Sequence, residues 1–471
     1  MTETVEPDLC VVGAGSGGLA VAAGAVQMGA SVVLVEAGKM GGDCLNYGCV
    51  PSKSLIAAGR AAQGLRTAGR FGIEACEPQV DFAAVNDHVR GVIAAIAPHD
   101  SVERFEGLGV RVLRARARFT GPEEVEADGV RVRARRFVLA TGSRAAIPPV
   151  PGLDAVPFLT NETIFELRRR PEHLLVLGGG PIGCELAQAH RRLGSKVTML
   201  DLGPILPRDD PELSAVVRAR LLDEGVELVE RVEVLRAEPG PALVIRQDGL
   251  ERRLEGSDLL VAAGRRPNVE EMGLEAAGIA HGKGGIEVDG RLRTTNRRVF
   301  AMGDVAGGLQ FTHLAGWHAG IVIQNALFGL PAKARTSAMP RVTYTDPELA
   351  SVGLSEAAAQ EQGRSVKILR WTFSHNDRAQ AERETEGLIK VVASRRGRIL
   401  GAGIAGPHAG ELILPWVMAV GQGMRLKAMA SVIAPYPTLS EVSKRAAGSF
   451  FAPTLYGPWT RRLVRLLAKL G

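Results

Sequence analysis

The sequence predicts an α/β protein of about three domains. An apolar strand runs into a glycine-rich turn near the start of the chain, and the same pattern returns near its middle. From about Met339 the pattern changes to antiparallel strands and helices without a further nucleotide motif. A chain of 471 residues is long enough for about three domains. We expect a nucleotide domain at 1–150 with a return segment at 273–338, a second at 151–272, and a third domain at 339–471.

The first nucleotide unit is a strand, turn, helix and strand. The strand at 9–12 runs into the sequence GAGSGG, and the strand at 31–36 ends in Glu36. Glycines let the chain turn tightly and let a pyrophosphate approach, while the amino end of the helix stabilises negative charge. A carboxylate at the end of the second strand can accept both hydroxyls of a ribose. The expected binding residues are Gly13, Gly15, Gly18 and Glu36.

The second unit repeats this pattern with the strand at 173–177, the sequence GGGPIG, a helix and the strand at 196–201. Glu36 follows Gly18 by 18 residues, and Asp201 follows Gly183 by the same 18 residues. Two Rossmann-like domains and two dinucleotides are therefore predicted. Asp201 favours a ribose with free hydroxyls, so we expect NAD(H) rather than NADP(H). The expected binding residues are Gly178, Gly180, Gly183 and Asp201.

Small residues end three further predicted strands. The strand from Phe137 runs into ATGSR, and a proline-rich connector at 147–152 then marks a domain boundary. A similar turn, AAGRRPN, closes the second unit, and the strand from Val299 ends at Asp304, which can hydrogen-bond a polyol. The first domain is therefore expected to be discontinuous. The candidate binding residues in these turns are Thr141, Gly142, Gly264, Gly303 and Asp304.

Cys44 and Cys49 are interpreted as a redox-active disulfide. Five steps along an ideal helix span roughly 7.5 Å, whereas the Cα atoms of a disulfide seldom lie more than about 7 Å apart. The pair must therefore distort its turn, and Gly48 supplies a permissive backbone. A strained bridge is easily reduced. The alternatives are two buried thiols or half of a metal site; no histidine or further cysteine clusters nearby, so we expect no metal.

Composition excludes several classes of protein. The formal net charge of +6 is modest, so it does not indicate nucleic-acid binding. No apolar run is long enough for a membrane span, and the acidic start lacks the features of a signal peptide, so a cytoplasmic protein is expected. Alternating arginines indicate strands with a solvated face or, alternatively, a surface for an acidic protein; they are Arg114, Arg116, Arg118, Arg131, Arg133 and Arg135.

Residues 459–471 predict a short, basic, amphipathic helix. Its apolar face carries Leu463, Leu466, Leu467 and Leu470, and its basic face carries Arg461, Arg465 and Lys469. The helix either packs on its own chain or docks weakly on a membrane surface or a partner protein.

Taken together, these motifs make the chain resemble the class I pyridine nucleotide-disulfide oxidoreductases. This family of two-dinucleotide flavoproteins includes dihydrolipoamide dehydrogenase, glutathione reductase, mercuric reductase and soluble transhydrogenase. The resemblance runs nearly end to end through GGDCLNYGCVPSK, both glycine motifs, ATGSR, AAGRRPN, MGDV and PTLSE. It implies FAD in the first glycine motif, a nicotinamide cofactor in the second, and a homodimer built by an α+β dimerisation domain at the carboxyl end.

The resemblance also implies roles for individual residues. Cys49 is similar to the thiol beside the flavin that forms a charge-transfer complex, and Cys44 to the thiol that exchanges with substrate. Lys53 resembles the lysine near the flavin that pairs with a helix glutamate, here Glu185. Asp304 would hold the ribityl chain of FAD. Thr312 and His313 would lie near the flavin ring, although a packing role for His313 is an equal alternative.

Two positions depart from the family pattern. Lipoamide and glutathione reductases carry a histidine before the late Pro-Thr, where it serves the other subunit as acid and base; here the residue is Tyr436, although the orienting glutamate is retained as Glu441. A phenol with a pKa of about 10 is poorly matched to proton transfer near neutrality, so slow disulfide turnover is expected. Pro181 stands where many members have a tyrosine that gates the nicotinamide pocket.

Three functions are consistent with these residues. The leading hypothesis is an FAD enzyme that moves electrons between NAD(H) and a small or protein-bound dithiol through Cys44 and Cys49, similar to dihydrolipoamide dehydrogenase. The second is a diaphorase, transhydrogenase or mercuric reductase-like enzyme that reduces a quinone, a metal ion or a second nicotinamide. The third is an electron-transfer subunit that docks on a partner or an anionic membrane through its basic tail.

Overall fold

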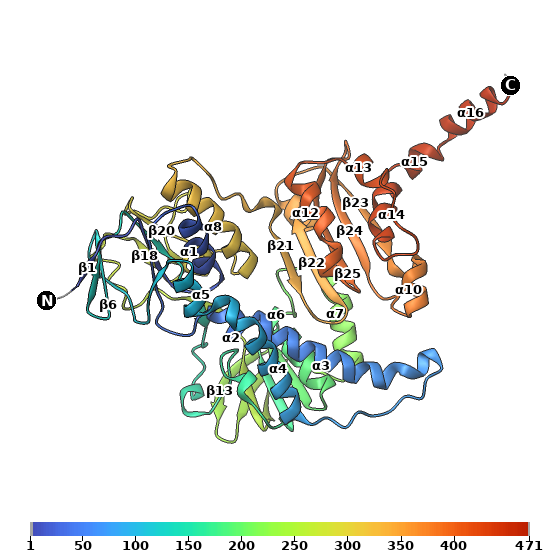
Figure 1. The fold of residues 1–471 in the computed structure, drawn as a ribbon. Helices are drawn as coiled ribbons and strands as arrows, with labels where there is room; N and C mark the ends of the chain where they lie inside the picture. The colour runs from blue at the N-terminus through green and yellow to red at the C-terminus, as the bar shows by residue number, and fades with distance from the viewer. Residues whose placement is uncertain (1–2, 470–471) are drawn as a thin grey trace. The chain divides into compact units, whose positions relative to one another are not determined.

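The computed structural model describes residues 3–469 (Figure 1). The chain divides into two compact units. Unit 1 comprises residues 1–58, 79–178 and 234–335, and unit 2 comprises residues 59–78, 179–233 and 336–471. This division does not test the predicted domain boundaries, which stay predictions.

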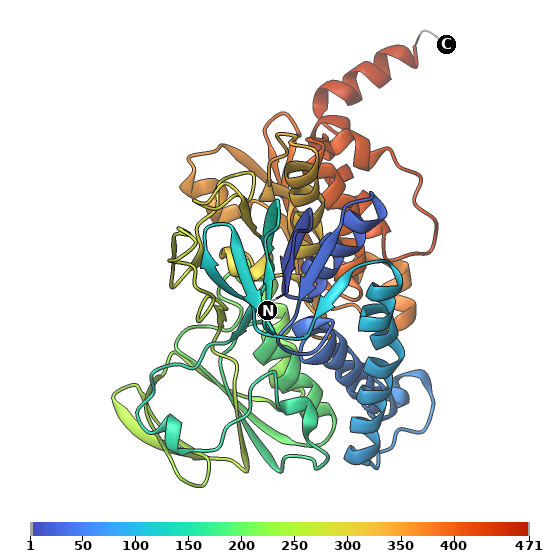
Figure 2. The same cartoon turned by 60° about the vertical axis from the view of Figure 1, so that its left-hand side comes forward.

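The central sheet of unit 1 is parallel, with the order β20-β8-β2-β3-β4 (Figure 2, with β2 and β3 in dark blue). Its strands are Leu9–Val12 (β2), Val32–Val35 (β3), Arg111–Leu113 (β4), Arg136–Leu139 (β8) and Val299–Ala301 (β20). Strands covered on both faces need continuous apolar runs, which explains the sequences LCVV and VVLV. Because β20 pairs with β8, the segment after residue 298 returns to the first sheet, as the sequence predicts.

Helices cover one face of this sheet and a small second sheet covers the other. Helices α1 (Ser16–Gln27) and α8 (Thr312–Leu327) lie side by side in Figure 1 and pack on Leu9, Val11 and Leu34. The opposite face, with Cys10 and Val12, packs against the sheet β1-β7-β6-β5. That sheet consists of Thr4–Val5 (β1), Arg118–Gly121 (β5), Glu124–Ala127 (β6) and Val130–Val132 (β7).

The predicted arginine strands are only partly correct. Arg118 in β5 and Arg131 in β7 have exposed side chains, as a solvated sheet face requires. Arg114 and Arg116, however, lie in the connection between β4 and β5, and Arg133 and Arg135 lie in the connection between β7 and β8. The alternation there continues through a loop, which period-two reasoning cannot distinguish from a strand.

The remaining elements of unit 1 surround these sheets. Strand β10 (His173–Leu177) pairs in parallel with β16 (Asp258–Val261). The strands Glu233–Glu238 (β13), Ala242–Gln247 (β14) and Leu250–Glu255 (β15) form a three-stranded sheet, and Ser143–Ala145 (β9) pairs antiparallel with Arg265–Pro267 (β17). The other elements are Gly42–Asn46 (α2), Cys49–Thr67 (α3, which continues into unit 2), Phe82–Ile96 (α4), Val102–Gly107 (α5), His281–Gly282 (β18) and Gly285–Ile286 (β19).

Unit 2 is built around an antiparallel sheet with the order β21-β22-β25-β24-β23. Its strands are Pro340–Thr343 (β21), Glu348–Gly353 (β22), Val366–Thr372 (β23), Leu388–Ser394 (β24) and Ile399–Gly406 (β25). The antiparallel pattern predicted for the third domain is therefore correct. Buried Trp416 and Ala446 cover one face of the sheet from α12 (Leu414–Gly421) and α14 (Glu441–Ser449).

The other face of this sheet carries a buried cation. Lys390 lies in β24 between two core residues, so its side chain points away from the apolar cluster. Its Nζ lies 2.8 Å from Asp210 Oδ2 and 2.8 Å from Glu356 Oε2. The remaining elements of unit 2 are Pro181–Arg192 (α6), Lys196–Asp201 (β11), Pro211–Asp223 (α7), Glu227–Glu230 (β12), Glu356–Glu361 (α9), Asp377–Glu382 (α10), Ala409–Leu412 (α11), Leu426–Ala430 (α13), Ala452–Leu455 (α15) and Pro458–Leu467 (α16).

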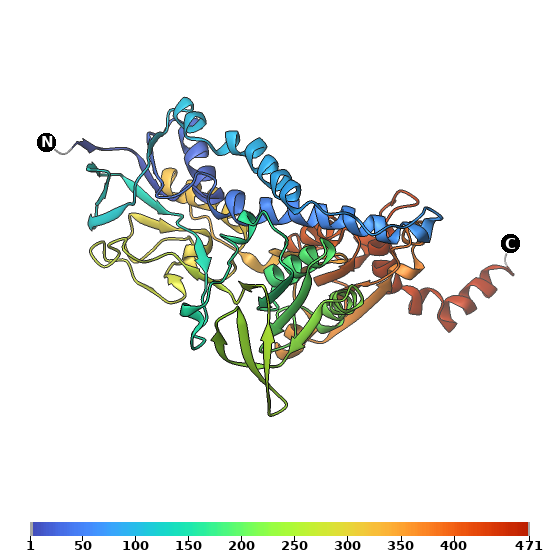
Figure 3. The ribbon, with the colours of Figure 1, turned by 90° about the horizontal axis from the view of Figure 1, so that it is seen from below.

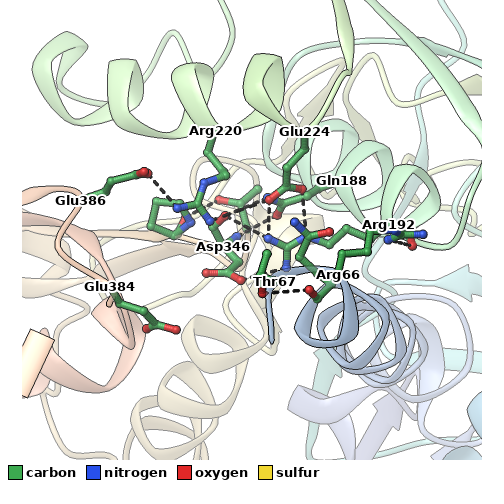
Figure 4. A network of polar contacts seen from close by, with 12 residues as sticks. Arg66, Thr67, Gln188, Arg192, Arg220, Glu224, Asp346, Glu384 and Glu386 are labelled. Carbon is green, nitrogen blue, oxygen red and sulfur yellow. Dashed lines mark hydrogen bonds and ion pairs between the residues drawn. The ribbon is translucent and has the colours of Figure 1, made fainter. Parts of the chain in front are cut away.

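A buried polar network joins α6, α7 and the loop before β22 (Figure 4). Arg192 Nε donates to Glu224 Oε2 at 2.8 Å, and its Nη1 donates to Asp346 Oδ2 at 2.8 Å. Gln188 Nε2 donates to the carbonyl of Asp346 at 2.8 Å. Arg192 and Glu224 are 3% and 4% exposed, so each charge depends on its partner rather than on water.

Substituting Glu224→Gln should destabilise unit 2 by about 3 kcal/mol, because it removes the buried counter-ion of Arg192. Urea unfolding followed by tryptophan fluorescence measures this, since Trp371 and Trp416 both belong to unit 2. The control Arg116→Gln breaks an exposed pair with Glu271 and should cost less than about 1 kcal/mol. Equal losses in the two variants would contradict the buried role.

Candidate active site

The first glycine motif leaves an open cradle at the start of α1. Gly13 has φ +104°, and a Cβ there would lie 2.4 Å from the carbonyl oxygen of Ala140 after β8. Gly18 is required by packing, because a Cβ there would lie 1.8 Å from the oxygen of Gly13. Gly15 differs: its φ is −77° and nothing lies within 4 Å of its Cβ position. The protein's own packing therefore does not require Gly15, whereas a closely approaching ligand does.

Glu36 is anchored beside this cradle. Its Oε2 accepts the N–H of Ala14 at 2.5 Å, and its Oε1 accepts the N–H of Gly38 at 2.6 Å. A carboxylate has about four acceptor positions, so two remain for the hydroxyls of a ribose.

The second motif reproduces the same local arrangement. Gly178 has φ +122°, and a Cβ there would lie 2.4 Å from the oxygen of Ala262. Gly180 begins α6 with open space at its Cβ position, and Gly183 is buried in that helix. Asp201 accepts the N–H groups of Gly179 at 2.6 Å and Gly203 at 2.8 Å, as Glu36 does in the first motif.

Both cradles fit the pyrophosphate of a dinucleotide. Neither helix has a capping side chain or an acidic residue in its first turn, so backbone N–H groups at both amino ends are free to face an anion. Gly15 and Gly180 leave the space that the phosphates need, and Glu36 and Asp201 are held ready for ribose hydroxyls. The residues of this chain thus fit FAD and a nicotinamide nucleotide.

A polar cluster lies at the polyol position. Asp304 Oδ2 accepts the hydroxyl of Ser143 at 2.5 Å, and burial raises the pKa of Asp304. Arg265 Nε donates to the same hydroxyl at 2.7 Å. Gly303, with φ +66°, precedes Asp304, and its N–H donates to Nδ1 of buried His318 at 3.2 Å.

The two small-residue turns are joined to each other. Thr141 Oγ1 donates to the carbonyl of Asn268 at 2.9 Å, and Asn268 Nδ2 donates to the carbonyl of Thr141 at 2.9 Å. Gly142 and Gly264 have φ +67° and φ +131°, which non-glycine residues rarely adopt. The turns around Thr141 and Asn268 are therefore joined by reciprocal hydrogen bonds from side chain to backbone.

The cysteine turn is broken in the way that the spacing predicts. Helix α2 ends at Asn46 and α3 begins at Cys49, with Tyr47 and Gly48 between them. A Cβ on Gly48 would lie 2.9 Å from Asp43 Oδ2 and 3.1 Å from the Asp43 carbonyl oxygen, so a side chain there would displace the Asp43 carboxylate. Both cysteines are thiols in this structure, with Cys44 half-buried and Cys49 exposed.

The two thiols have opposite acidities. Cys49 has a pKa lowered to about 6, first by a hydrogen bond from Cys44, and further by Thr312 and by the positive charge of Lys53. The same bond raises the pKa of Cys44, as do burial and the carboxylate of Asp43. Cys49 Sγ lies 3.3 Å from Thr312 Oγ1 at the start of α8. The structure thus brings the predicted residue Thr312 to the thiolate.

His313, the next residue, stacks on Phe311 with ring centroids 5.1 Å apart. Lys53 belongs to unit 1 and Glu185 to unit 2, so their predicted pairing stays a prediction. Within unit 2, Glu185 is buried and accepts the backbone N–H of Tyr344 at 2.9 Å.

Tyr436 is 70% exposed, and its hydroxyl donates to Asp377 Oδ2 at 2.9 Å. This bond raises the pKa of Tyr436, because the carboxylate stabilises the protonated phenol, and the charge of Glu441 acts in the same direction. Glu441 begins α14, with Oε1 4.0 Å from Arg445 Nη2. Asp377 is a site residue that sequence reasoning missed, because no motif connects it to Tyr436.

A second missed group surrounds Asp43, the residue before Cys44. Arg265 Nη2 lies 3.1 Å from Asp43 Oδ2, and Asn161 Nδ2 donates to Asp43 Oδ1 at 2.9 Å. Asp43 lies within GGDCLNYGCVPSK and Arg265 within AAGRRPN, so these motifs could have pointed to both residues. Asn161 belongs to no such motif.

Within residues 3–469, no three histidine, cysteine, aspartate or glutamate side chains are grouped to hold a metal ion. Over the same range, every helix is too short or too polar to cross a bilayer.

Comparison with protein families agrees with this geometry. Residues 7–319 match the pyridine nucleotide-disulphide oxidoreductase family, and residues 339–447 match its dimerisation domain. This dimerisation domain supports homodimer formation.

Known relatives cover nearly the whole chain. A mercuric reductase from Streptomyces lividans is 37% identical over 94% of this chain and 96% of its own length. A dihydrolipoyl dehydrogenase from Thermus scotoductus is 37% identical over 93% of this chain and 96% of its own. Among solved structures, LpdA from Mycobacterium tuberculosis has a TM-score of 0.85 at 26% identity, covering 94% of this chain and 99% of that one. The flavoprotein disulfide reductase RclA from Escherichia coli, as a Cu(II) complex, has a TM-score of 0.84 at 26% identity with the same coverage.

These matches confirm the resemblance seen in the motifs and the predicted α/β fold. The chain belongs to the pyridine nucleotide-disulphide oxidoreductase family, and it is an FAD-dependent enzyme that uses a pyridine nucleotide.

Proposed function

We propose that this enzyme moves two electrons between NAD(H) and a dithiol or disulfide substrate through Cys44 and Cys49. The observation that carries the proposal is the acidity of Cys49, whose thiolate is stabilised by Cys44, Thr312 and Lys53. A substrate of the dihydrolipoamide class, small or protein-bound, accords with the similarity to the dihydrolipoyl dehydrogenase of Thermus scotoductus.

The exchange begins with the pair oxidised. A substrate thiolate attacks Cys44 Sγ, the bond between Cys44 and Cys49 breaks, and Cys49 leaves as a thiolate. Thr312 and the positive charge of Lys53 lower the pKa of Cys49 and favour this step, because a more acidic thiol is a better leaving group; Cys44 is bonded to substrate at this point and donates no hydrogen bond. The second substrate thiol loses its proton and attacks the substrate sulfur, which frees Cys44. The substrate departs as a disulfide, and its two electrons remain on the reduced pair Cys44 and Cys49.

The cofactors bind to the two cradles in this proposal. FAD, once bound, supplies the relay of two electrons between the cysteine pair and the nicotinamide. The residues that would hold FAD are Gly13, Gly15, Gly18, Glu36, Lys53, Thr141, Gly142, Gly303, Asp304, Thr312 and His313. Those that would hold the nicotinamide nucleotide are Gly178, Gly180, Gly183, Asp201 and Gly264. The anchored carboxylate of Asp201 disfavours a 2′-phosphate, which supports NAD(H) over NADP(H).

Arg265 is a positioning residue for the thiol pair in this proposal. The charge of Asp43 raises the pKa of both cysteines, which works against a thiolate at Cys49. The guanidinium of Arg265 lies 3.1 Å from Asp43 Oδ2 and offsets that charge. Asn161 fixes the other carboxylate oxygen.

A second candidate is a diaphorase, transhydrogenase or mercuric reductase-like enzyme that reduces a quinone, a metal ion or a second nicotinamide. Tyr436 favours it, because a phenol held by Asp377 has a raised pKa and is a poor acid or base near neutrality. The similarity to mercuric reductases accords with a metal-ion substrate.

The proposed assembly is a homodimer that places Tyr436 and Glu441 at the active site of the partner subunit. Exposed apolar side chains on unit 2 support such an interface. They are Leu414, Met418, Val432, Ile433 and Tyr436. Location in the cytoplasm and the absence of a nucleic-acid partner stay predictions.

Cys44→Ser should lower the rate of NAD reduction by dihydrolipoamide by at least about 10³-fold, because the sulfur that substrate attacks is gone. The rate is measured as NADH absorbance under anaerobic conditions. Cys76→Ser, which replaces an exposed cysteine outside the site, is the matched control. Unchanged turnover in Cys44→Ser would exclude the thiol route and favour the diaphorase.

Tyr436→His should raise the same rate by about 10²-fold or more, because imidazole titrates near neutrality. Tyr436→Phe is the control and should leave the rate unchanged. If the phenylalanine variant loses activity instead, the phenol itself takes part in proton transfer.

Arg265→Gln should raise the pKa of Cys49 by about half a unit or more, because Asp43 then acts on the thiolate without a counter-ion. The pH profile of Cys49 alkylation by iodoacetamide in the reduced enzyme measures this shift. The double variant Asp43→Asn with Arg265→Gln should return the profile toward that of the parent enzyme. A shift that persists in the double variant would assign the effect to lost packing.

A further inference from the structure

The carboxyl-terminal helix α16 stands clear of the rest of unit 2 in all three views (Figures 1, 2 and 3). None of its residues is buried in the described chain. The interpretation that this helix packs on its own chain is therefore wrong for the described residues, and Leu470 lies outside them. The match to the dimerisation domain ends at residue 447, so α15 and α16 lie outside the family match.

The two faces of α16 differ sharply in chemistry. Trp459, Leu463, Leu466 and Leu467 follow the spacing of one helix face, and all four are exposed. The basic residues Arg461, Arg462 and Arg465 occupy another face and are also exposed, and exposed Lys469 follows the end of the helix. Arg462 Cζ lies 5.7 Å from the ring centroid of Trp459, where the two faces meet.

The charge of the whole chain is concentrated at this end. After Glu441 the sequence contains no acidic residue and six basic ones, which are Lys444, Arg445, Arg461, Arg462, Arg465 and Lys469. Of the 57 basic residues, 51 therefore remain for the rest of the chain, against 51 acidic residues, so the tail carries the whole net charge of +6.

We propose that α16 docks this enzyme onto an anionic lipid surface, with its apolar face inserted at the headgroup boundary. A helix of ten residues is about 15 Å long, which suits lying in the interface rather than crossing it. Tryptophan favours this depth, and the adjacent basic strip faces anionic headgroups. A second copy of the chain is a weaker partner, because outside the tail its charges balance and offer no net attraction. This proposal does not depend on the cysteine chemistry.

The experiment is sedimentation of the FAD-loaded, full-length enzyme with vesicles. Phosphatidylcholine vesicles containing about 30 mol% phosphatidylglycerol are compared with vesicles of phosphatidylcholine alone. We expect the enzyme to bind the anionic vesicles at least about 10-fold more tightly than the neutral ones. Salt at about 0.5 M should weaken this binding, because it screens the surface charges.

Two variants separate the faces of the helix. Leu463→Glu with Leu467→Glu should abolish binding, and Arg461→Gln with Arg465→Gln should weaken it about 10-fold. FAD content and near-ultraviolet circular dichroism report the fold, which should not change because α16 buries no residue. Equal binding to both vesicles, equal binding by the leucine variant, or no binding overturns the proposal. If the leucine variant instead dissociates a dimer in sedimentation velocity, the helix covers a second copy and the proposal also fails.

Discussion

The site depends on one constraint, the close approach of backbone to backbone at the ends of parallel strands. A side chain at Gly13 would collide with the carbonyl oxygen of Ala140, which follows the neighbouring strand β8. A side chain at Gly178 would collide with that of Ala262, which follows the neighbouring strand β16. These contacts fix the loops from which α1 and α6 begin, so their free N–H groups converge where phosphates bind. The same turn after β8 leads to Ser143, which holds Asp304, and to the network that reaches Asp43. The residues expected to bind FAD and the loop that carries the thiols are therefore held by the same network of polar contacts.

The sequence predicted the features that are local, and it missed those that join distant segments. Strand 9–12, both glycine turns and the anchored acids Glu36 and Asp201 follow from spacing, because each forms within one βαβ unit. Asn161 lies 118 residues from Asp43, and Asp377 lies 59 residues from Tyr436, so no periodicity could bring either pair together. Arg114 and Arg116 alternate like a strand, but Leu113 ends the pairing before them. The link between Lys53 and Glu185 stays a prediction.

In the proposed exchange, the protein assists the release of Cys49 more than it assists the deprotonation of the substrate thiol. Thr312 and the positive charge of Lys53 lower the pKa of Cys49 and make it a better leaving group. Tyr436, in contrast, has its proton held by Asp377 and cannot easily accept another near neutrality. Release of Cys49 is therefore favoured, while deprotonation of the incoming thiol is left to the substrate or to solvent. For a substrate of the proposed dithiol class, deprotonation of the incoming thiol is therefore the step expected to limit the exchange.

Helix α16 buries no residue, so the fold of unit 2 does not depend on it. The core of unit 2 closes around Trp416, Val442 and Ala446, all of which precede it. Removing charge or apolar area from α16 is therefore expected to leave this core unchanged. One short helix binds a bilayer weakly, but a homodimer carries two, and once one is bound the second binds at a high effective concentration. The homodimer that we propose for the active site would thus also strengthen a weak surface contact.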